Sequence, residues 1–326
     1  MLAAATWAAR SAPRTTALAL ERALLAEAGP EVVFVGNSTT REGIDEAEAE
    51  RRLGVRVTRL WTDGSGSALW WLYLKNVVAA ATPPPRVCCI LFRDHELTNP
   101  TLALTGAPGM QLRALMGADE PELDRLGWSA AFDPIRRLLA RSWPLYSVRD
   151  SAATAVDRFV RDRIVGPLLR IAPGQAGLHY WLALSDGRMD PALLTAYQQR
   201  EEDQRDTTSL DFDAQVGKSY LPEMVETARA AGVTLVLVRI RTRRDARGIP
   251  MPGRNRRFGA RLGEWCAGRG VPLIDHRNDE ALTPDLFGYG DHLTKRGAQF
   301  FTERLCDEIR ATLGEDLATG KGPVHQ

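Results

Sequence analysis

The chain has 326 residues, of which 44% are hydrophobic and 25% are charged, and its formal net charge at pH 7 is +1. A chain of this length and composition can bury a substantial core, which is typical of a soluble globular protein. The near-balanced charge gives no reason to expect nucleic acid or an acidic partner.

No stretch reaches the roughly 18 uninterrupted apolar residues that a membrane-spanning helix needs. The best apolar stretch, 70–81, contains Lys75 and Asn76 and is predicted to be a core helix. The first residues lack the basic start of a signal peptide, and their apolar run stops at Arg10. The sequence as printed therefore predicts a cytoplasmic protein. An extracytoplasmic, membrane-associated location is the alternative if an anchor precedes this start.

Strand-like and helical segments alternate along the chain. The predicted strands span 31–36, 55–60, 86–92, 233–240 and 271–276. The predicted helices span 14–28, 45–52 (with Asp45 as its cap), 67–81, 217–231, 254–269 and 294–313. Five strands separated by helices predict a three-layer α/β/α sandwich around a five-stranded parallel sheet. Its crossovers should be right-handed, and its ligand crevice should lie at the carboxyl edge of the strands.

Residues 101–216 interrupt this alternation with mostly helical patterns. Because this segment follows the third strand directly, we expect it to lie over or beside the crevice as a cap that can shape an acceptor site. A stabilising side domain or an oligomer surface is the alternative. The predicted α/β domain therefore comprises 31–100 and 217–313. Residues 1–30 form a helical lead-in, and residues 314–326 form a C-terminal tail.

The four cysteines are predicted to be buried free thiols, because their spacing matches neither a zinc site nor a disulfide framework. They are Cys88, Cys89, Cys266 and Cys306. Cys88 and Cys89 are neighbours in a predicted strand and should therefore point to opposite faces of the sheet. No spacing of His, Cys, Asp and Glu indicates a metal site, and no cofactor is predicted.

Two short segments, at opposite ends of the alternating strands and helices, contain candidate catalytic residues. Ser38 follows the apolar run 32–35 in a Gly-Asn-Ser segment, at the mouth of a buried strand. His292 comes just before the last predicted helix, with Asp291 beside it. These positions suit the nucleophile and the general base of an acyl-handling enzyme. The alternatives are a helix-capping role for Ser38 and a helix-start or surface position for His292, with His276 as the fallback base.

The same segments give the chain a family resemblance. "EVVFVGNSTTREGID" (31–45) resembles the first block of the SGNH/GDSL hydrolases, although Asn37 replaces the usual Asp. "GYGDHLTKRGAQFFTERL" (288–305) resembles their last block, in which an Asp precedes the catalytic His. "TDGSGSA" (62–68) and "ILFRDHELTNP" (90–100) stand where the family has an oxyanion-hole glycine and Gly-x-Asn-Asp. The closer likeness is to the branch associated with O-acetylation of polysaccharides such as alginate and peptidoglycan.

The resemblance leaves the acid of a Ser-His-Asp triad open. The family's Asp lies three residues before the His, a position that is Tyr289 here. Asp291, directly before the His, can reach the imidazole only in a non-repeating loop, which Gly288 and Gly290 allow. Asp285 is the competing acid, and a Ser-His pair without an acid is a third interpretation.

The resemblance also implies an oxyanion hole. Its donors would be the backbone N–H of the nucleophile, an N–H at Gly64 or Gly66, and a group on the loop of Arg93. Arg93-Asp94 replaces the family's Gly-x-Asn-Asp, and a guanidinium both donates hydrogen bonds and adds charge suited to an anionic transition state. A salt bridge from Arg93 to Asp94 or Glu96 is the alternative.

An arginine-rich run follows the fourth predicted strand, with eight arginines between Arg239 and Arg257. Such a cluster can bind an anionic substrate, such as a uronate, a phosphate or an acyl-carrier group. A solvated loop that Asp245 partly balances is the alternative.

Together these features predict serine-dependent transfer or hydrolysis of an O-acyl group, expected to be acetyl, on a carbohydrate or glycan. Ser38, His292 and Asp291 would act through an acyl-enzyme. The resemblance implies a membrane-bound O-acyltransferase as the acyl donor. The alternative is a non-catalytic carbohydrate-binding or scaffold protein with a degenerate site.

Overall fold

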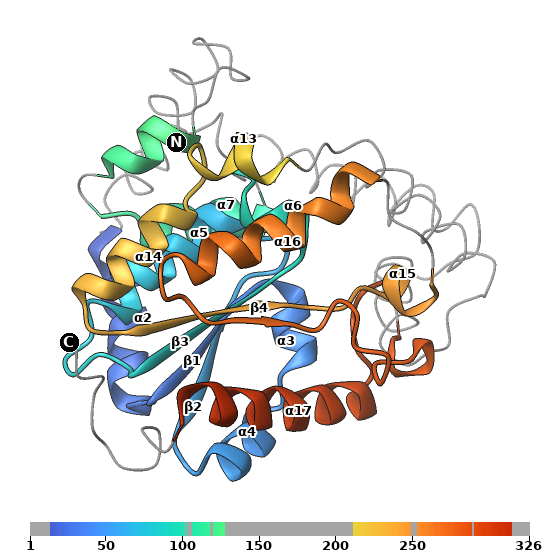
Figure 1. Cartoon of the computed structure of the whole chain (residues 1–326). Coiled ribbons are helices and arrows are strands. Elements are labelled where there is room, and N and C mark those ends of the chain that lie inside the picture. The colour runs from blue at the N-terminus through green and yellow to red at the C-terminus, as the bar shows by residue number, and fades with distance from the viewer. Residues whose placement is uncertain are drawn as a thin grey trace, which may run out of the picture.

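A five-stranded, all-parallel sheet forms the middle layer of the protein (Figure 1). The computed structural model describes residues 14–100, 102, 106–117, 120–127, 211–248, 253–288 and 290–314. The strands are β1 (Val32–Gly36), β2 (Val57–Trp61), β3 (Val87–Phe92), β4 (Thr234–Arg239) and β5 (Leu273–Asp275). Their order in the sheet is β2-β1-β3-β4-β5, and every neighbouring pair is parallel. The predicted α/β fold class is confirmed.

Helices cover both faces of the sheet. On one face lie α4 (Glu46–Leu53) and α17 (Lys295–Leu313), and on the other lie α5 (Ser67–Leu72), η1 (Tyr73–Val78), α14 (Leu221–Ala230) and α16 (Gly253–Ala267) (Figure 1). The remaining described elements are α2 (Arg14–Ala28), α3 (Ser38–Gly43), α6 (Asp94–Leu97), α7 (Gly106–Leu115), η2 (Leu123–Gly127), α13 (Phe212–Val216), α15 (Arg243–Ala246) and η4 (Pro284–Leu286).

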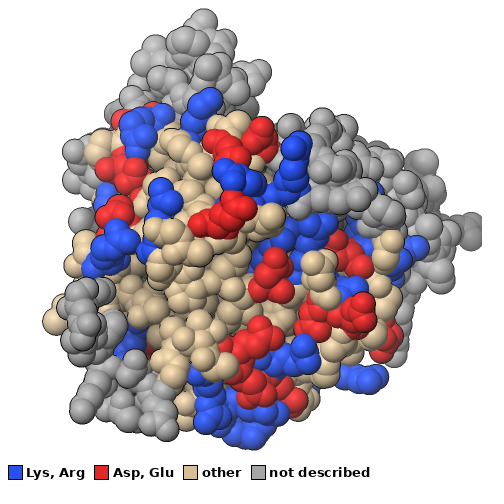
Figure 2. All heavy atoms as spheres, in the orientation of Figure 1, with Lys and Arg blue, Asp and Glu red and all other residues tan. Residues whose placement is uncertain are grey.

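The strands are apolar on both faces, so they separate two hydrophobic cores. In β1, Val33 and Val35 belong to the core under α5 and α14, whereas Val32 and Phe34 belong to the core under α17. A parallel sheet that is covered on both sides needs such strands. Charged side chains of both signs are interleaved over the face shown in Figure 2, in keeping with the net charge of +1.

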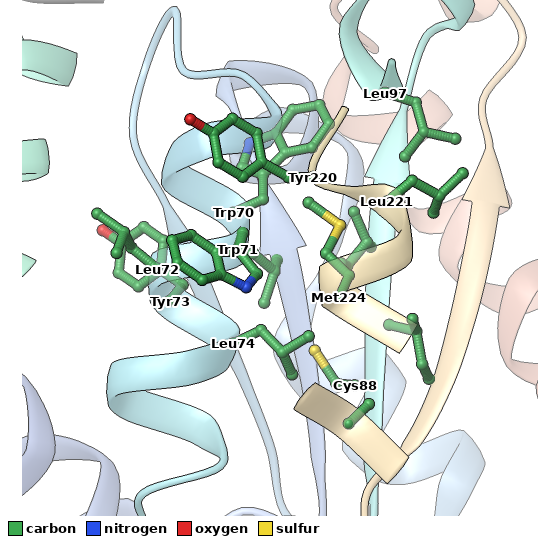
Figure 3. Packing of buried hydrophobic residues seen from close by; sticks show 14 of the residues in the cluster. Trp70, Trp71, Leu72, Tyr73, Leu74, Cys88, Leu97, Tyr220, Leu221 and Met224 are labelled. Atoms are coloured by element: carbon green, nitrogen blue, oxygen red, sulfur yellow. The ribbon is translucent and has the colours of Figure 1, made fainter. Parts of the chain in front are cut away.

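Large aromatic side chains fill the core on the α5 and α14 side (Figure 3). Trp71 stacks on Tyr220 with ring centroids 5.4 Å apart, and both side chains are almost fully buried. Burial of side chains of this size contributes roughly 1.5–3 kcal/mol each. Trp70 is also buried, and its Nε1 donates a 3.0 Å hydrogen bond to Ser65 Oγ. This bond ties the core to the loop between β2 and α5, at the carboxyl edge of the sheet.

The structure departs from the predicted elements in several places, and the helix predicted over 217–231, for example, spans Leu221–Ala230. The predicted helix over 67–81 is an α-helical segment, α5, followed by a π-helical segment, η1. The second strand begins at Val57 rather than at residue 55. The short helix α3 was not predicted, because six residues with no apolar periodicity give no helical signal. The predicted cap of α4 is confirmed, since Asp45 accepts a hydrogen bond from the Glu48 N–H.

Both ends of the predicted insertion join the main cores. Leu112 and Leu115 of α7 and Leu123 and Leu126 of η2 are buried in the core under α5, and Phe212 of α13 packs edge-on against Phe258 of α16. Most other residues of 101–216 lie outside the described part of the chain, so the cap stays a prediction. The lead-in residues 1–13 and the tail residues 315–326 also lie outside it.

The cysteine prediction is confirmed. All four cysteines are buried and free. Cys88 lies in the core under α5, and Cys89 lies in the core under α17. Burial raises the pKa of the Cys88 thiol to about 12, so it is protonated at neutral pH. Among the described residues, no helix is both long enough and apolar enough to cross a membrane.

Candidate active site

The candidate site lies where the strand order reverses. In the order β2-β1-β3-β4-β5, the chain leaves β1 toward one side of the sheet and later passes from β3 toward the other. Open α/β sheets bind ligands at such a switch point, outside the carboxyl ends of the strands. Ser38 follows β1 by two residues, and Arg93 follows β3 directly. The sheet topology therefore makes this edge the expected position of a ligand-binding site.

Ser38 and His292 are in hydrogen-bond contact there. His292 Nε2 lies 2.9 Å from Ser38 Oγ, although the two residues are 254 positions apart in the sequence. Ser38 is the first residue of α3, and that helix is capped by Asn37, whose Oδ1 accepts hydrogen bonds from the backbone N–H and the hydroxyl of Thr39. The alternative role of Ser38 as the capping residue is therefore wrong. A serine hydroxyl within reach of an imidazole nitrogen is the geometry that a nucleophile and its general base require.

His292 is in an environment that favours its neutral form. Burial lowers the pKa of the imidazole from its ordinary value of 6.5, and the positive charges of Arg93 and Arg41 lower it further. The carboxylates of Glu42 and Asp291 act in the opposite direction without cancelling this effect. A neutral imidazole can accept a proton from a serine hydroxyl, so His292 is in the right protonation state for a base at neutral pH.

Glu42 is a site residue that the sequence reasoning missed. It lies four positions after Ser38 on α3, one helical turn away, and its carboxylate contacts Arg41 at 3.0 Å. Of the negative charges that raise the pKa of His292, that of Glu42 has a larger effect than that of Asp291. The signal that could have found it is the i, i+4 spacing from the candidate nucleophile.

Asp291 is buried and connects three loops. Its Oδ2 accepts a 2.8 Å hydrogen bond from Arg93 Nη1, and its Oδ1 accepts a 2.9 Å bond from the backbone N–H of Arg243. The predicted tight loop before α17 is present: Gly290 has a φ of 55°, and the Gly288 N–H donates to the His292 carbonyl. Asp291 is therefore held at the site, next to His292 in the chain and between the loops that follow β3 and β4.

The competing acid Asp285 has a different setting. It lies in the short turn η4, where the hydroxyl of Thr283 donates a 2.6 Å hydrogen bond to its carboxylate. Its side chain is 64% exposed and lies 3.8 Å from Arg296, so its partners are surface groups. The fallback base His276 is buried elsewhere, edge-on to Phe301 of α17, with its Nδ1 3.3 Å from Asp279.

Arg93 forms the centre of a charged network. Its guanidinium donates to Glu96 through Nε and Nη2 and to Asp291 through Nη1. Burial would lower the pKa of Arg93, but the two carboxylates raise it well above its ordinary value, so the group stays charged. The predicted alternative, a salt bridge to Glu96, is thus present. Three of the five guanidinium N–H groups donate these bonds, and the other two have no acceptor among the residues that the structure describes.

Glu96 also explains why an amide stands at position 37. Asn37 is buried, and its Nδ2 donates a 2.8 Å hydrogen bond to Glu96 Oε1 and a longer one to the Ser65 carbonyl. A carboxylate at position 37 could not donate to Glu96. Asn37, Glu96, Arg93 and Asp291 therefore form one continuous hydrogen-bonded chain around the Ser38 and His292 pair.

The glycines predicted to form the oxyanion hole flank a serine that is anchored to β1. Ser65 Oγ donates to the Gly36 carbonyl, and the Ser65 N–H donates to the Thr62 carbonyl. Gly64 has a φ of 70°, a conformation that favours glycine, and Gly66 caps α5. A Cβ on Gly66 would meet no heavy atom within 4 Å, so the space beside it is open. The loop is thus held next to the end of the strand that leads to the nucleophile.

The arginine-rich run begins with residues that brace the protein internally. Arg239 is buried and paired with Asp275 at 2.9 Å, and its guanidinium fills the space beside Gly259 that a Cβ would occupy. Arg241 donates to the backbone carbonyls of residues 279 and 245, and Arg243 Nη1 donates to the Gly288 carbonyl. The later part of the run, 249–256, is outside the described side chains, so the predicted anion site stays a prediction.

Comparison of the sequence with protein-family models and with curated proteins found no match.

Proposed function

We propose that this protein is a serine-dependent enzyme that transfers or hydrolyses O-acyl groups. The observation that carries the proposal is the 2.9 Å contact between Ser38 Oγ and His292 Nε2 at the switch point of a parallel sheet. A lowered pKa of His292 supports it, because the imidazole is then neutral and basic at physiological pH.

The proposed chemistry has two halves. In the first, His292 Nε2 takes the proton of the Ser38 hydroxyl while Oγ attacks the acyl carbonyl carbon. The tetrahedral intermediate then expels the donor alcohol, which receives that proton from His292, and an acyl-serine ester remains. In the second half an acceptor hydroxyl, from a sugar or from water, gives its proton to His292 and attacks the ester, and Ser38 leaves with that proton.

The surrounding charges suit this cycle. His292 becomes an imidazolium in both halves, and the negative charges of Glu42 and Asp291 favour that charged form. The oxyanion needs preorganised donors, for which the backbone N–H groups at Ser38 and at Gly64 or Gly66 and the two unused N–H groups of Arg93 are the candidates. Arg93 in turn holds Asp291 in place.

The acyl group and the acceptor are proposed from the resemblance to SGNH hydrolases of the polysaccharide O-acetylation branch. That resemblance favours an acetyl group, a carbohydrate or glycan acceptor, and a membrane-bound O-acyltransferase as the donor. An acyl-enzyme surrounded by water transfers to a sugar only if the sugar is bound and oriented, which can provide effective molarities of about 10⁵–10⁸ M.

A fluorophosphonate probe tests the proposal. We expect wild-type protein to be labelled at Ser38, with the site identified by peptide mass spectrometry. Labelling should be lost in Ser38→Ala and His292→Ala, both checked for folding by circular dichroism. Heat-denatured wild-type protein is the control for non-specific reaction. Folded wild-type protein that neither takes the label nor hydrolyses p-nitrophenyl acetate would contradict the proposal and favour a non-catalytic carbohydrate-binding role.

A further inference from the structure

We propose that Trp61, Arg41 and Asp63 form a binding subsite for a neutral pyranose ring beside Ser38. The inference rests on the proposed function, since the ring would belong to the carbohydrate acceptor. Trp61 is the last residue of β2 and pairs in register with Gly36, the last residue of β1. Arg41 lies three positions after Ser38 on α3, so the two share a side of that helix. Arg41 contacts both Trp61 and Asp63, so this group lies against the short helix that begins at Ser38.

Trp61 is a large aromatic side chain that stays partly in solvent. It is 38% exposed, whereas Trp70 and Trp71 of α5 are fully buried. The guanidinium of Arg41 lies over its ring at 5.1 Å from the centroid. This contact holds the indole in one orientation and leaves part of its surface open. The ring face is electronegative, and the C–H groups of a pyranose ring present an apolar, slightly positive face that complements it.

Hydroxyl-binding groups lie next to this ring. Arg41 Nε lies 3.3 Å from Asp63 Oδ1, so the guanidinium and the carboxylate form an ion pair beside the ring. The two side chains are 30% and 37% exposed, so a ligand can reach their outer ends. A guanidinium donor beside a carboxylate acceptor can bind neighbouring sugar hydroxyls, which both donate and accept.

The local charge selects a neutral ring. Arg41 is flanked by two carboxylates, those of Asp63 at 3.3 Å and Glu42 at 3.0 Å. One positive and two negative charges disfavour a uronate or a sugar phosphate at this position, because the added anion would face a net negative charge. Arg239, Arg241 and Arg243, at the start of the arginine-rich run, have partners within the protein outside this group of three residues.

Calorimetric titration of the full chain without an acyl donor tests the subsite. The neutral ligands are chitotetraose, cellotetraose and maltotetraose, and tetragalacturonate is the anionic comparison. We expect at least one neutral ligand to bind more tightly than tetragalacturonate. Trp61→Ala should weaken that binding about tenfold or more, and Arg41→Gln should weaken it as well. Trp61→Phe should retain part of the affinity.

The chain offers a matched control in Trp265 and Arg269 of the α16 region, where the arginine lies 4.1 Å from the ring centroid. Arg269→Gln should leave binding unchanged. No binding of any neutral ligand, tighter binding of tetragalacturonate, or equal affinity in Trp61→Ala would each overturn the subsite. Wild-type protein that binds sugar through Trp61 but never reacts at Ser38 would keep the subsite and refute the chemistry. Reaction at Ser38 together with an unchanged sugar affinity in Trp61→Ala would refute the subsite and keep the proposed chemistry.

Discussion

Asn37→Asp tests whether position 37 is matched to Glu96. In the structure, Asn37 Nδ2 donates a 2.8 Å hydrogen bond to Glu96 Oε1, and Asn37 is buried. The substitution removes a bond to a charged acceptor, which is worth about 1.5–3 kcal/mol. It also puts two carboxylates in contact, and two like charges 4 Å apart repel by about 4 kcal/mol at an effective dielectric constant of 20. Proton uptake will relieve part of that repulsion, so we expect a loss of about 3 kcal/mol or more in the free energy of unfolding.

The loss should depend on pH in a defined direction. The repulsion raises the pKa of the introduced carboxyl in the folded state above its unfolded value of about 3.9. A folded state that binds more protons than the unfolded state loses stability as pH rises. The difference in stability between wild type and Asn37→Asp should therefore be smallest below about pH 4 and should grow as pH rises through the folded-state pKa.

Urea unfolding of a double-mutant cycle measures this coupling. Combining Asn37→Asp with Glu96→Gln restores a donor and an acceptor at the same place, so the double variant should lose at least about 2 kcal/mol less than the sum of the singles. Asn278→Asp, at an exposed asparagine, is the control and should change stability by less than about 0.5 kcal/mol. Additivity of the two single losses within about 0.5 kcal/mol would refute the matching of Asn37 to Glu96.

Three further predictions concern His292 and the carboxylates around it. Asp291→Asn should reduce p-nitrophenyl acetate turnover far more than Asp285→Asn, because Asp291 is held at the site and Asp285 is a surface group. A larger loss of turnover in Asp285→Asn would make Asp285 the acid of the triad. Equally small losses in both variants would indicate a Ser-His pair without an acid. The profile of kcat/KM against pH should rise with pH through a single pKa below 6.5, because the base must be neutral and its pKa is lowered. Glu42→Gln should shift this rise in kcat/KM to lower pH, since the Glu42 carboxylate raises the pKa of His292. A rise at the same pH or at higher pH would show that Glu42 does not act on His292.

The sheet could be predicted because its signal is local. The run Val87–Phe92 is apolar without interruption, which a strand buried on both faces requires, and Pro83 to Pro85 separate it from the preceding helix. Helix α17 was equally clear, because Thr294 caps it and its apolar face repeats at helical spacing. Such features depend on neighbours within a few residues, and they fix where each strand ends.

The contact between Ser38 and His292 followed from the same reasoning combined with the resemblance. Ser38 could be placed at the carboxyl end of the first strand, and a histidine before the last helix had to return to the same edge of a parallel sheet. Placement at an edge was predictable, whereas the partners of each side chain were not. Glu42 was missed because its i, i+4 spacing from Ser38 is informative only if these residues are helical, and the local sequence does not show that α3 forms.

The network of Arg93 could not be predicted from the sequence. Arg93 and Glu96 are three positions apart, but Asp291 is 198 positions from Arg93 and Asn37 is 59 positions from Glu96. No local pattern couples these residues, so nothing in the sequence indicates that they contact one another. In the folded protein they form one hydrogen-bonded set in which the amide of Asn37 complements Glu96 and the guanidinium of Arg93 complements Glu96 and Asp291.

That set also limits what Arg93 can do for an oxyanion. Its positive charge faces two carboxylates at hydrogen-bond distance, so the field that it exerts on a third anion is largely offset. Its two remaining N–H groups can still donate hydrogen bonds, but with little net charge behind them. Under the proposed function, we therefore expect the stronger stabilisation from the backbone N–H groups at Ser38 and beside Ser65, next to the cap of α3 and the Ser65 bond to β1. Backbone donors held in this way need no reorganisation during the reaction, which is what makes such groups effective at an oxyanion.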